Sequence, residues 1–279
     1  MTEQSEKILN SAGYIKSKFP ENYKPLTAII TEKGFEILKG KKVLDEVDAE
    51  IIADTNTDNA NDRLKIVFAK IDDTDILICN GRHHYFDGIS MRNIGHMIYV
   101  LRYLGIKNII SIDEVGHLNP RFSCGETALV YDHINLAGDN PLIGVNDDEL
   151  GIRFPDMSNA YDKELFKKVY KVLQEKMIRI NESVYLGTIG PQSETDAEAR
   201  FYREIGSDVV GYSMVPENIT SVHAGLKFIG IGLITRNLVA DKMMEDERSD
   251  KLRIKDQKDS LVKASKELEK ILQKVIKSL

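Results

Sequence analysis

Three acid–base side chains, Asp113, Glu114 and His117, stand close together in the segment IDEVGHLNP (112–120). The apolar run before this segment, and the glycine and proline within it, are typical of a strand that ends in a functional loop. Carboxylates and an imidazole are groups that accept and release protons. Glu114 and His117 are therefore candidate catalytic groups, whereas Asp113 is expected to stabilise the loop through local backbone hydrogen bonds.

Three further polar segments follow apolar runs in the same way: GRHHYFDG (81–88), GPQSE (190–194) and TRN (235–237). Ligands of open α/β proteins bind at the carboxyl ends of strands. The four polar segments are therefore expected to meet in one cleft. His83 and His84 are adjacent and face opposite ways on an extended chain, and we expect His84 to be the functional one.

The elements that must position these segments alternate between strand and helix. Apolar runs predict strands at 26–31, 48–53, 63–71, 75–80, 107–112, 127–136, 183–190, 208–213 and 228–235. Amphipathic spacing predicts helices at 3–18, 90–105, 162–180, 195–206, 216–226 and 260–279. This alternation indicates an α/β protein with helices on both faces of a sheet. No repeat, low-complexity segment or linker divides the sequence, so residues 1–279 are expected to form a single domain.

Composition narrows the class of protein. The sequence is 42% apolar, which supports a substantial core, and its net charge of −6 argues against nucleic-acid binding. Its two cysteines form no CxxC motif, which favours a reducing compartment and no zinc site. The N-terminus lacks the apolar segment of a secretory signal, and the apolar runs are too short to span a membrane. We therefore expect a cytoplasmic protein with no membrane partner, no metal and no cofactor.

Several longer motifs carry a family resemblance. They are GRHHYFDG (81–88), HLNPRF (117–122), DHINLAGDNPLIGVNDDELGIRFPDMSNAYD (132–162), GPQSETDAEAR (190–200), VGYSMVPE (210–217) and GLIT (232–235). In order and spacing the chain resembles the trimeric purine nucleoside phosphorylases over nearly its whole length. The resemblance implies one α/β domain with a mixed, twisted central sheet, a homotrimer, and a cleft for phosphate, ribose and base. It also implies phosphorolysis of an N-ribosidic bond.

The resemblance assigns roles to individual positions. It implies phosphate binding by Arg82, His84 and Ser213, base binding by Glu194, and a contact from Phe154 to the ribose of a neighbouring subunit. Other positions depart from the family pattern: Phe86 and Tyr212 stand where other residues contact the ribose, and Arg236 replaces an asparagine that hydrogen-bonds the purine. We expect all eight residues to line the cleft.

The phosphate end departs furthest from the family. Glu32 and Lys33 in TEKGFE (31–36), and Glu114, replace small residues. Two unit charges of like sign at 4 Å cost about 4 kcal/mol at an effective dielectric constant near 20, and a phosphate dianion costs more. Lys33 could offset part of this repulsion as a point charge. One hypothesis is that Glu114 has entered the phosphate pocket and acts as an acid or base with His84 or His117.

Three functions remain open on the sequence alone. Phosphorolysis of a purine nucleoside is the leading interpretation, with a nucleoside and inorganic phosphate as substrates. In the second, Glu114 activates water for hydrolysis, or takes a proton from the ribose for isomerisation or epimerisation. In the third, the chain binds a nucleoside without catalysis.

Overall fold

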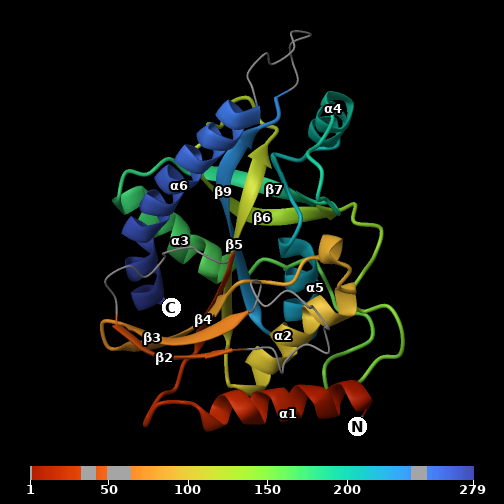
Figure 1. Ribbon diagram of the computed structural model, residues 1–279, viewed down its shortest axis with the longest axis vertical. Helices are drawn as coiled ribbons and strands as arrows, with labels where there is room; N and C mark the ends of the chain where they lie inside the picture. The colour runs from red at the N-terminus through yellow and green to blue at the C-terminus, as the bar shows by residue number, and fades with distance from the viewer. Residues whose placement is uncertain (1, 33–41, 49–63, 240–249) are drawn as a thin grey trace.

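The computed structural model describes residues 2–32, 42–48, 64–239 and 250–279 (Figure 1). Nine strands form one mixed sheet in the order β2-β3-β4-β1-β5-β8-β7-β6-β9. The strands are β1 (Thr27–Thr31), β2 (Lys42–Asp48), β3 (Lys65–Ile71), β4 (Thr74–Asn80), β5 (Asn108–His117), β6 (Thr127–Asn135), β7 (Asn181–Gly187), β8 (Val209–Gly211) and β9 (Lys227–Asn237). The expected α/β fold with a mixed central sheet is therefore confirmed.

The sheet has two different halves. In one half, β1 lies between β4 and β5 and runs parallel to both, while β2, β3 and β4 pair antiparallel. In the other half, β5 pairs with β9 as well as with β8, so that β5, β8, β7, β6 and β9 close on themselves. Strand β5 belongs to both halves, because its first residues, 108–111, pair with both β1 and β9. Asp113 and Glu114 lie just beyond that shared stretch.

Helices cover both faces of the sheet. The helices are α1 (Glu3–Ser17), α2 (Met91–Tyr103), α3 (Lys163–Glu175), α4 (Asp196–Glu204), α5 (Met214–His223) and α6 (Asp250–Ser278), with a short 3₁₀ turn, η2 (Tyr85–Asp87). Helices α3 and α6 pack together on one face, whereas α1, α2 and α5 lie on the other (Figure 1). Within the described residues, no helix is long and apolar enough to cross a membrane.

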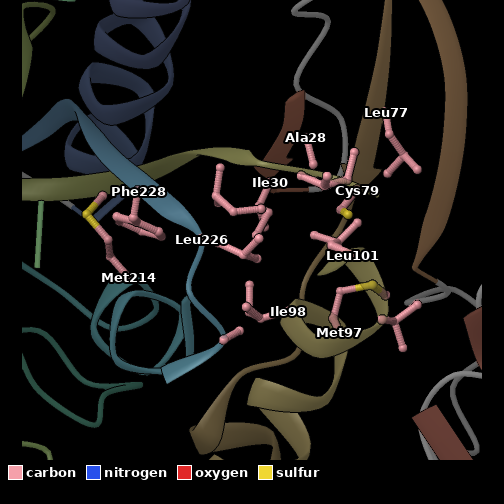
Figure 2. Packing of buried hydrophobic residues seen from close by; sticks show 14 of the residues in the cluster. Ala28, Ile30, Leu77, Cys79, Met97, Ile98, Leu101, Met214, Leu226 and Phe228 are labelled. Carbon is pink, nitrogen blue, oxygen red and sulfur yellow. The ribbon is translucent and has the colours of Figure 1, made fainter. Parts of the chain in front are cut away.

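The alternation of side chains along β1 builds both cores. Ile29 points into the core beneath α3 and α6, and its neighbour Ile30 points into the core beneath α2 and α5. Figure 2 shows Ile30 and Cys79 packed above Met97 and Leu101 of α2. Strand β1 is buried along its whole length, as the apolar run at its centre predicts.

Local signals set several helix starts. The Ser90 hydroxyl accepts a hydrogen bond from the backbone N–H of Asn93 at the start of α2. At the start of α4, Thr195 and Glu198 bond each other's backbone N–H in a reciprocal capping box. Helix α2 is followed by Gly105, whose φ of 95° suits a residue without a side chain. These helices therefore begin within a residue or two of their predicted starts.

The secondary structure differs from the sequence prediction in several places. The segment expected to be a loop, 112–120, is strand as far as His117, because β9 and β8 continue to pair with β5 there. Helix α3 stops at Glu175, and α6 begins at Asp250, ten residues earlier than predicted. Strand β2 was not predicted, and most of the strand predicted at 48–53 lies outside the described residues.

Candidate active site

The polar segments meet at the edge of the sheet where β1 and β4 end and β5 continues past them. These three strands are parallel neighbours, so their carboxyl ends point to the same edge. Glu32 directly follows β1, Arg82 follows β4, and Asp113 lies within β5, just past the residues that pair with β1. Glu217, from the first half of α5, joins them from the helix layer. Four different elements therefore supply one cluster of charged side chains.

Arg82 is the centre of this cluster, and its side chain is only 3% exposed. Its Nη1 lies 3.1 Å from Oδ1 of Asp113 and 3.2 Å from Oε1 of Glu32, and its Nε lies 3.2 Å from Oε1 of Glu217. Burial opposes the charge on Arg82, but the carboxylates of Glu217, Glu32 and Asp113 outweigh burial and raise the pKa of Arg82. The arginine expected to bind phosphate is thus surrounded by three carboxylates of its own chain.

Hydrogen bonds from neutral side chains hold the two inner carboxylates. The hydroxyl of Tyr185 donates to Oδ2 of Asp113 at 2.6 Å, and the hydroxyl of Ser111 donates to Oε2 of Glu217 at 2.6 Å. Burial raises the pKa values of Asp113 and Glu217, and the charge of Arg82 offsets part of each rise. Asp113 is therefore a buried partner of Arg82 and not the loop-stabilising residue that the sequence suggested.

His84 links Glu32 to Ser213. Its Nε2 lies 3.2 Å from Oε2 of Glu32, and its Nδ1 lies 3.1 Å from Oγ of Ser213. Burial lowers the pKa of His84, but the bond to Glu32 outweighs burial, so that the net shift is upward. Burial likewise raises the pKa of Glu32, and Arg82 and His84 outweigh it, so that this pKa falls. Both shifts favour the charged forms, so the contact between His84 and Glu32 becomes an ion pair when His84 is protonated.

Glu114 is half-buried beside this cluster. Burial raises its pKa, and the negative charges of Asp113 and Glu32 raise it further. The hydroxyl of Thr235 and the charge of Arg236 offset part of the rise. Glu114 is thus a carboxyl group whose proton is held more tightly than usual, which is the property required of an acid or base near neutral pH.

The two residues expected to bind the base are paired with each other. Nη1 of Arg236 donates to Oε2 of Glu194 at 3.0 Å, and the Glu194 side chain is only 3% exposed. The hydroxyl of Tyr212 donates to the other carboxylate oxygen at 3.1 Å, and the Arg236 guanidinium lies over the Tyr212 ring at 5.2 Å. Both oxygens of Glu194 are therefore engaged within the chain.

Aromatic rings connect the two ends of the site. His84 stacks on Phe86 with ring centroids 4.4 Å apart, and Phe86 meets the edge of Tyr212 at 6.2 Å. Burial raises the pKa of Tyr212 to about 12, so its hydroxyl stays protonated. Phe86 and Tyr212, the expected ribose contacts, thus lie between the Arg82 cluster and the pair formed by Glu194 and Arg236.

The remaining expected site residues are His117, Phe154 and Lys33. The ring of His117 is buried, and its Nδ1 bonds to the backbone oxygen of Asn119 at 3.0 Å. Burial lowers the pKa of His117. Phe154 is 86% exposed on the surface of this single chain. Lys33 lies outside the described residues.

Sequence reasoning gave no role to Tyr185, Ser111 or Glu217. Glu217 stands in the quoted motif VGYSMVPE, and that was the only signal for it. In the part of the chain that the structure describes, no group of three or more His, Cys, Asp or Glu side chains is placed to hold a metal ion.

Comparison with known proteins identifies the family. Residues 34–277 match the family model of the phosphorylase superfamily. The chain is 35% identical to purine nucleoside phosphorylase 1 of Bacillus subtilis, covering 86% of this chain and 92% of that protein. It is 34% identical to purine nucleoside phosphorylase 1 of Geobacillus stearothermophilus, covering 85% and 90%. The structure of the Schistosoma mansoni purine nucleoside phosphorylase in complex with inosine superposes with a TM-score of 0.86, at 26% identity over 98% of this chain and 96% of that one.

The chain therefore belongs to the phosphorylase superfamily. Within it, the chain belongs to the purine nucleoside phosphorylase family, as the motifs around Arg82, Glu194 and Ser213 indicated.

Proposed function

We propose that the protein cleaves the N-ribosidic bond of a purine nucleoside, with inorganic phosphate as the attacking group. The observation that carries this proposal is the linked arrangement of Arg82, His84 and Ser213 at one end of the site, with Glu194 at the other. The family relationship supports it, because the Bacillus subtilis relative is a purine nucleoside phosphorylase and the Schistosoma mansoni structures contain inosine and adenosine.

The residues suit the charges that such a reaction develops. Cleavage of a glycosidic bond passes through a cation-like sugar, and negative charge grows on the departing base. His84 and Ser213 supply hydrogen-bond donors at the phosphate end. Phe86 and Tyr212 pack against the ribose between the two ends. Arg236 places a guanidinium at the base end, where it stabilises the departing purine.

We propose a homotrimer in which Phe154 completes the ribose site of a neighbouring subunit. Support comes from a run of exposed apolar side chains on the surface that includes Phe154: Ile143, Val145 and Ile152 are each more than 60% exposed. Light scattering of the purified protein measures the assembly directly. Cys79 and Cys124 are not joined by a disulfide, which supports the proposal of a reducing compartment such as the cytoplasm.

A second candidate reaction has its own support. Glu114 is half-buried with a raised pKa next to Asp113 and Glu32, which is a suitable environment for a general acid or base. If Glu114 activates water, the products are ribose and free base. If it takes a proton from the sugar, the product is an isomeric nucleoside.

The test is chromatography of purine nucleosides incubated with the protein, with and without phosphate. Free base that appears only with phosphate is the expected result. Free base without phosphate identifies a hydrolase, and a shifted nucleoside peak of unchanged mass identifies an isomerase or epimerase. If no product forms but a nucleoside raises the melting temperature, the chain is a binding protein.

A further inference from the structure

Glu32 bridges two donors of the anion site. Its Oε1 lies 3.2 Å from Nη1 of Arg82, and its Oε2 lies 3.2 Å from Nε2 of His84. One carboxylate thus takes both a guanidinium and an imidazole, two groups that otherwise could bind an oxyanion, the imidazole most strongly when it is protonated. The side chain follows β1 directly, so the backbone of a sheet strand fixes its starting point.

Glu32 differs from the two other carboxylates around Arg82. Asp113 and Glu217 have side chains that are 5% exposed, and Tyr185 and Ser111 bond them from behind. Glu32 has a side chain that is 23% exposed. Glu32 is thus the outermost of the three carboxylates, on the side from which a dissolved anion would approach Arg82.

We propose that Glu32 is the residue that sets the anion selectivity of the site, because its carboxylate occupies the position of the phosphate between Arg82 and His84. Phosphate binds there only by displacing that carboxylate. The identity of the anion rests on the proposed function, whereas the occupation of the two donors rests on their contacts with Glu32.

Two physical effects make the displacement unfavourable. Phosphate must replace contacts that already exist within the chain, so that it gains only the difference between two ion pairs. A phosphate dianion beside the displaced carboxylate also meets a charge of the same sign, and Glu114 is a further carboxyl group nearby. A neutral side chain at position 32 weakens the first effect and removes most of the second.

The test is isothermal titration calorimetry of inorganic phosphate with the full chain and its variant Glu32→Gln. Glutamine keeps the length of the side chain and removes its charge. Arg82 retains Asp113 and Glu217, so the variant is expected to fold, and circular dichroism checks this. The control is Glu126→Gln, because Glu126 is a carboxylate of similar exposure, 18%, that is paired with Arg179 outside the site.

We expect Glu32→Gln to bind phosphate at least about tenfold more tightly than the unaltered protein, and Glu126→Gln to bind it with unchanged affinity. Glu32→Ala should show the same gain, which excludes a new bond from the glutamine amide as its source. Equal or weaker binding of phosphate by both Glu32 variants overturns the proposal.

This outcome does not depend on turnover. If the variants bind phosphate more tightly but no variant releases base, the role of Glu32 holds and the proposed reaction fails. If the unaltered protein releases base with phosphate and the Glu32 variants bind phosphate no better, the reaction holds and the role of Glu32 fails.

Discussion

Replacing Arg82 by methionine should reveal how strongly the buried carboxylates depend on one guanidinium. Methionine keeps much of the apolar volume of the side chain and removes its charge. Glu32 keeps its contact with His84, but Asp113 and Glu217 lose the cation that lies 3.1 and 3.2 Å from them. Their remaining hydrogen bonds come from neutral hydroxyl groups.

The expected loss of unfolding free energy is about 3–5 kcal/mol, the usual result of removing one partner from a buried ion pair. The stability of a natural domain is typically about 5–15 kcal/mol, so the variant should unfold at clearly lower urea concentration. Arg121→Met is the matched control, because Arg121 is exposed. Surface substitutions of this kind usually change stability by less than about 0.5 kcal/mol.

The loss should depend on pH. Burial already raises the pKa values of Asp113 and Glu217, and removing the guanidinium raises them further. A carboxyl group whose pKa is raised on folding contributes stability below its unfolded pKa, and that stability is lost as pH rises through the folded pKa. The variant should therefore lose less stability near about pH 5 than near about pH 8. A loss below about 1 kcal/mol, or one equal at both pH values, would refute this account of the cluster.

Three further substitutions test other parts of the site. Tyr185→Phe should cost about 1–3 kcal/mol in urea unfolding, because buried Asp113 loses a donor at 2.6 Å, and no measurable loss would contradict this. Glu114→Gln should keep phosphate-dependent base release within about tenfold in steady-state assays. Loss of base release with nucleoside binding intact would instead assign Glu114 the acid–base role. Arg236→Gln should lower kcat/KM for base release by about 100-fold, whereas an unchanged value would limit Arg236 to holding Glu194.

Much of the fold follows from local sequence signals. The capping box of Thr195 and Glu198 and the serine cap at Ser90 place two helices, and the continuous apolar run around Ile29 predicts a buried strand. The end of β5 could not be predicted in this way. Its last residues are strand only because β9 and β8 pair with them, and β9 lies more than a hundred residues away in the sequence.

The sequence predicted that certain residues would come together, but not which partners they would contact. Arg82, His84 and Ser213 come together as the motifs suggested. Which carboxylate Arg82 contacts depends on how separate elements pack, and no spacing in the sequence encodes that. Arg236 and Glu194 are a further case, because they are 42 positions apart and meet only through the arrangement of β9 and the loop after β7.

At both ends of the proposed site, the donors that would meet a substrate are already paired with a carboxylate of the chain. Glu32 holds Arg82 and His84 at one end, and Glu194 holds Arg236 at the other. A ligand therefore gains the difference between its own contacts and those it replaces, and not the full strength of a charge-assisted hydrogen bond. Such exchange penalises ligands with only weak acceptors and favours those that match the displaced carboxylates in charge and geometry. If the proposed site is correct, selectivity at each end is set by a carboxylate of the chain as much as by the cation that it contacts.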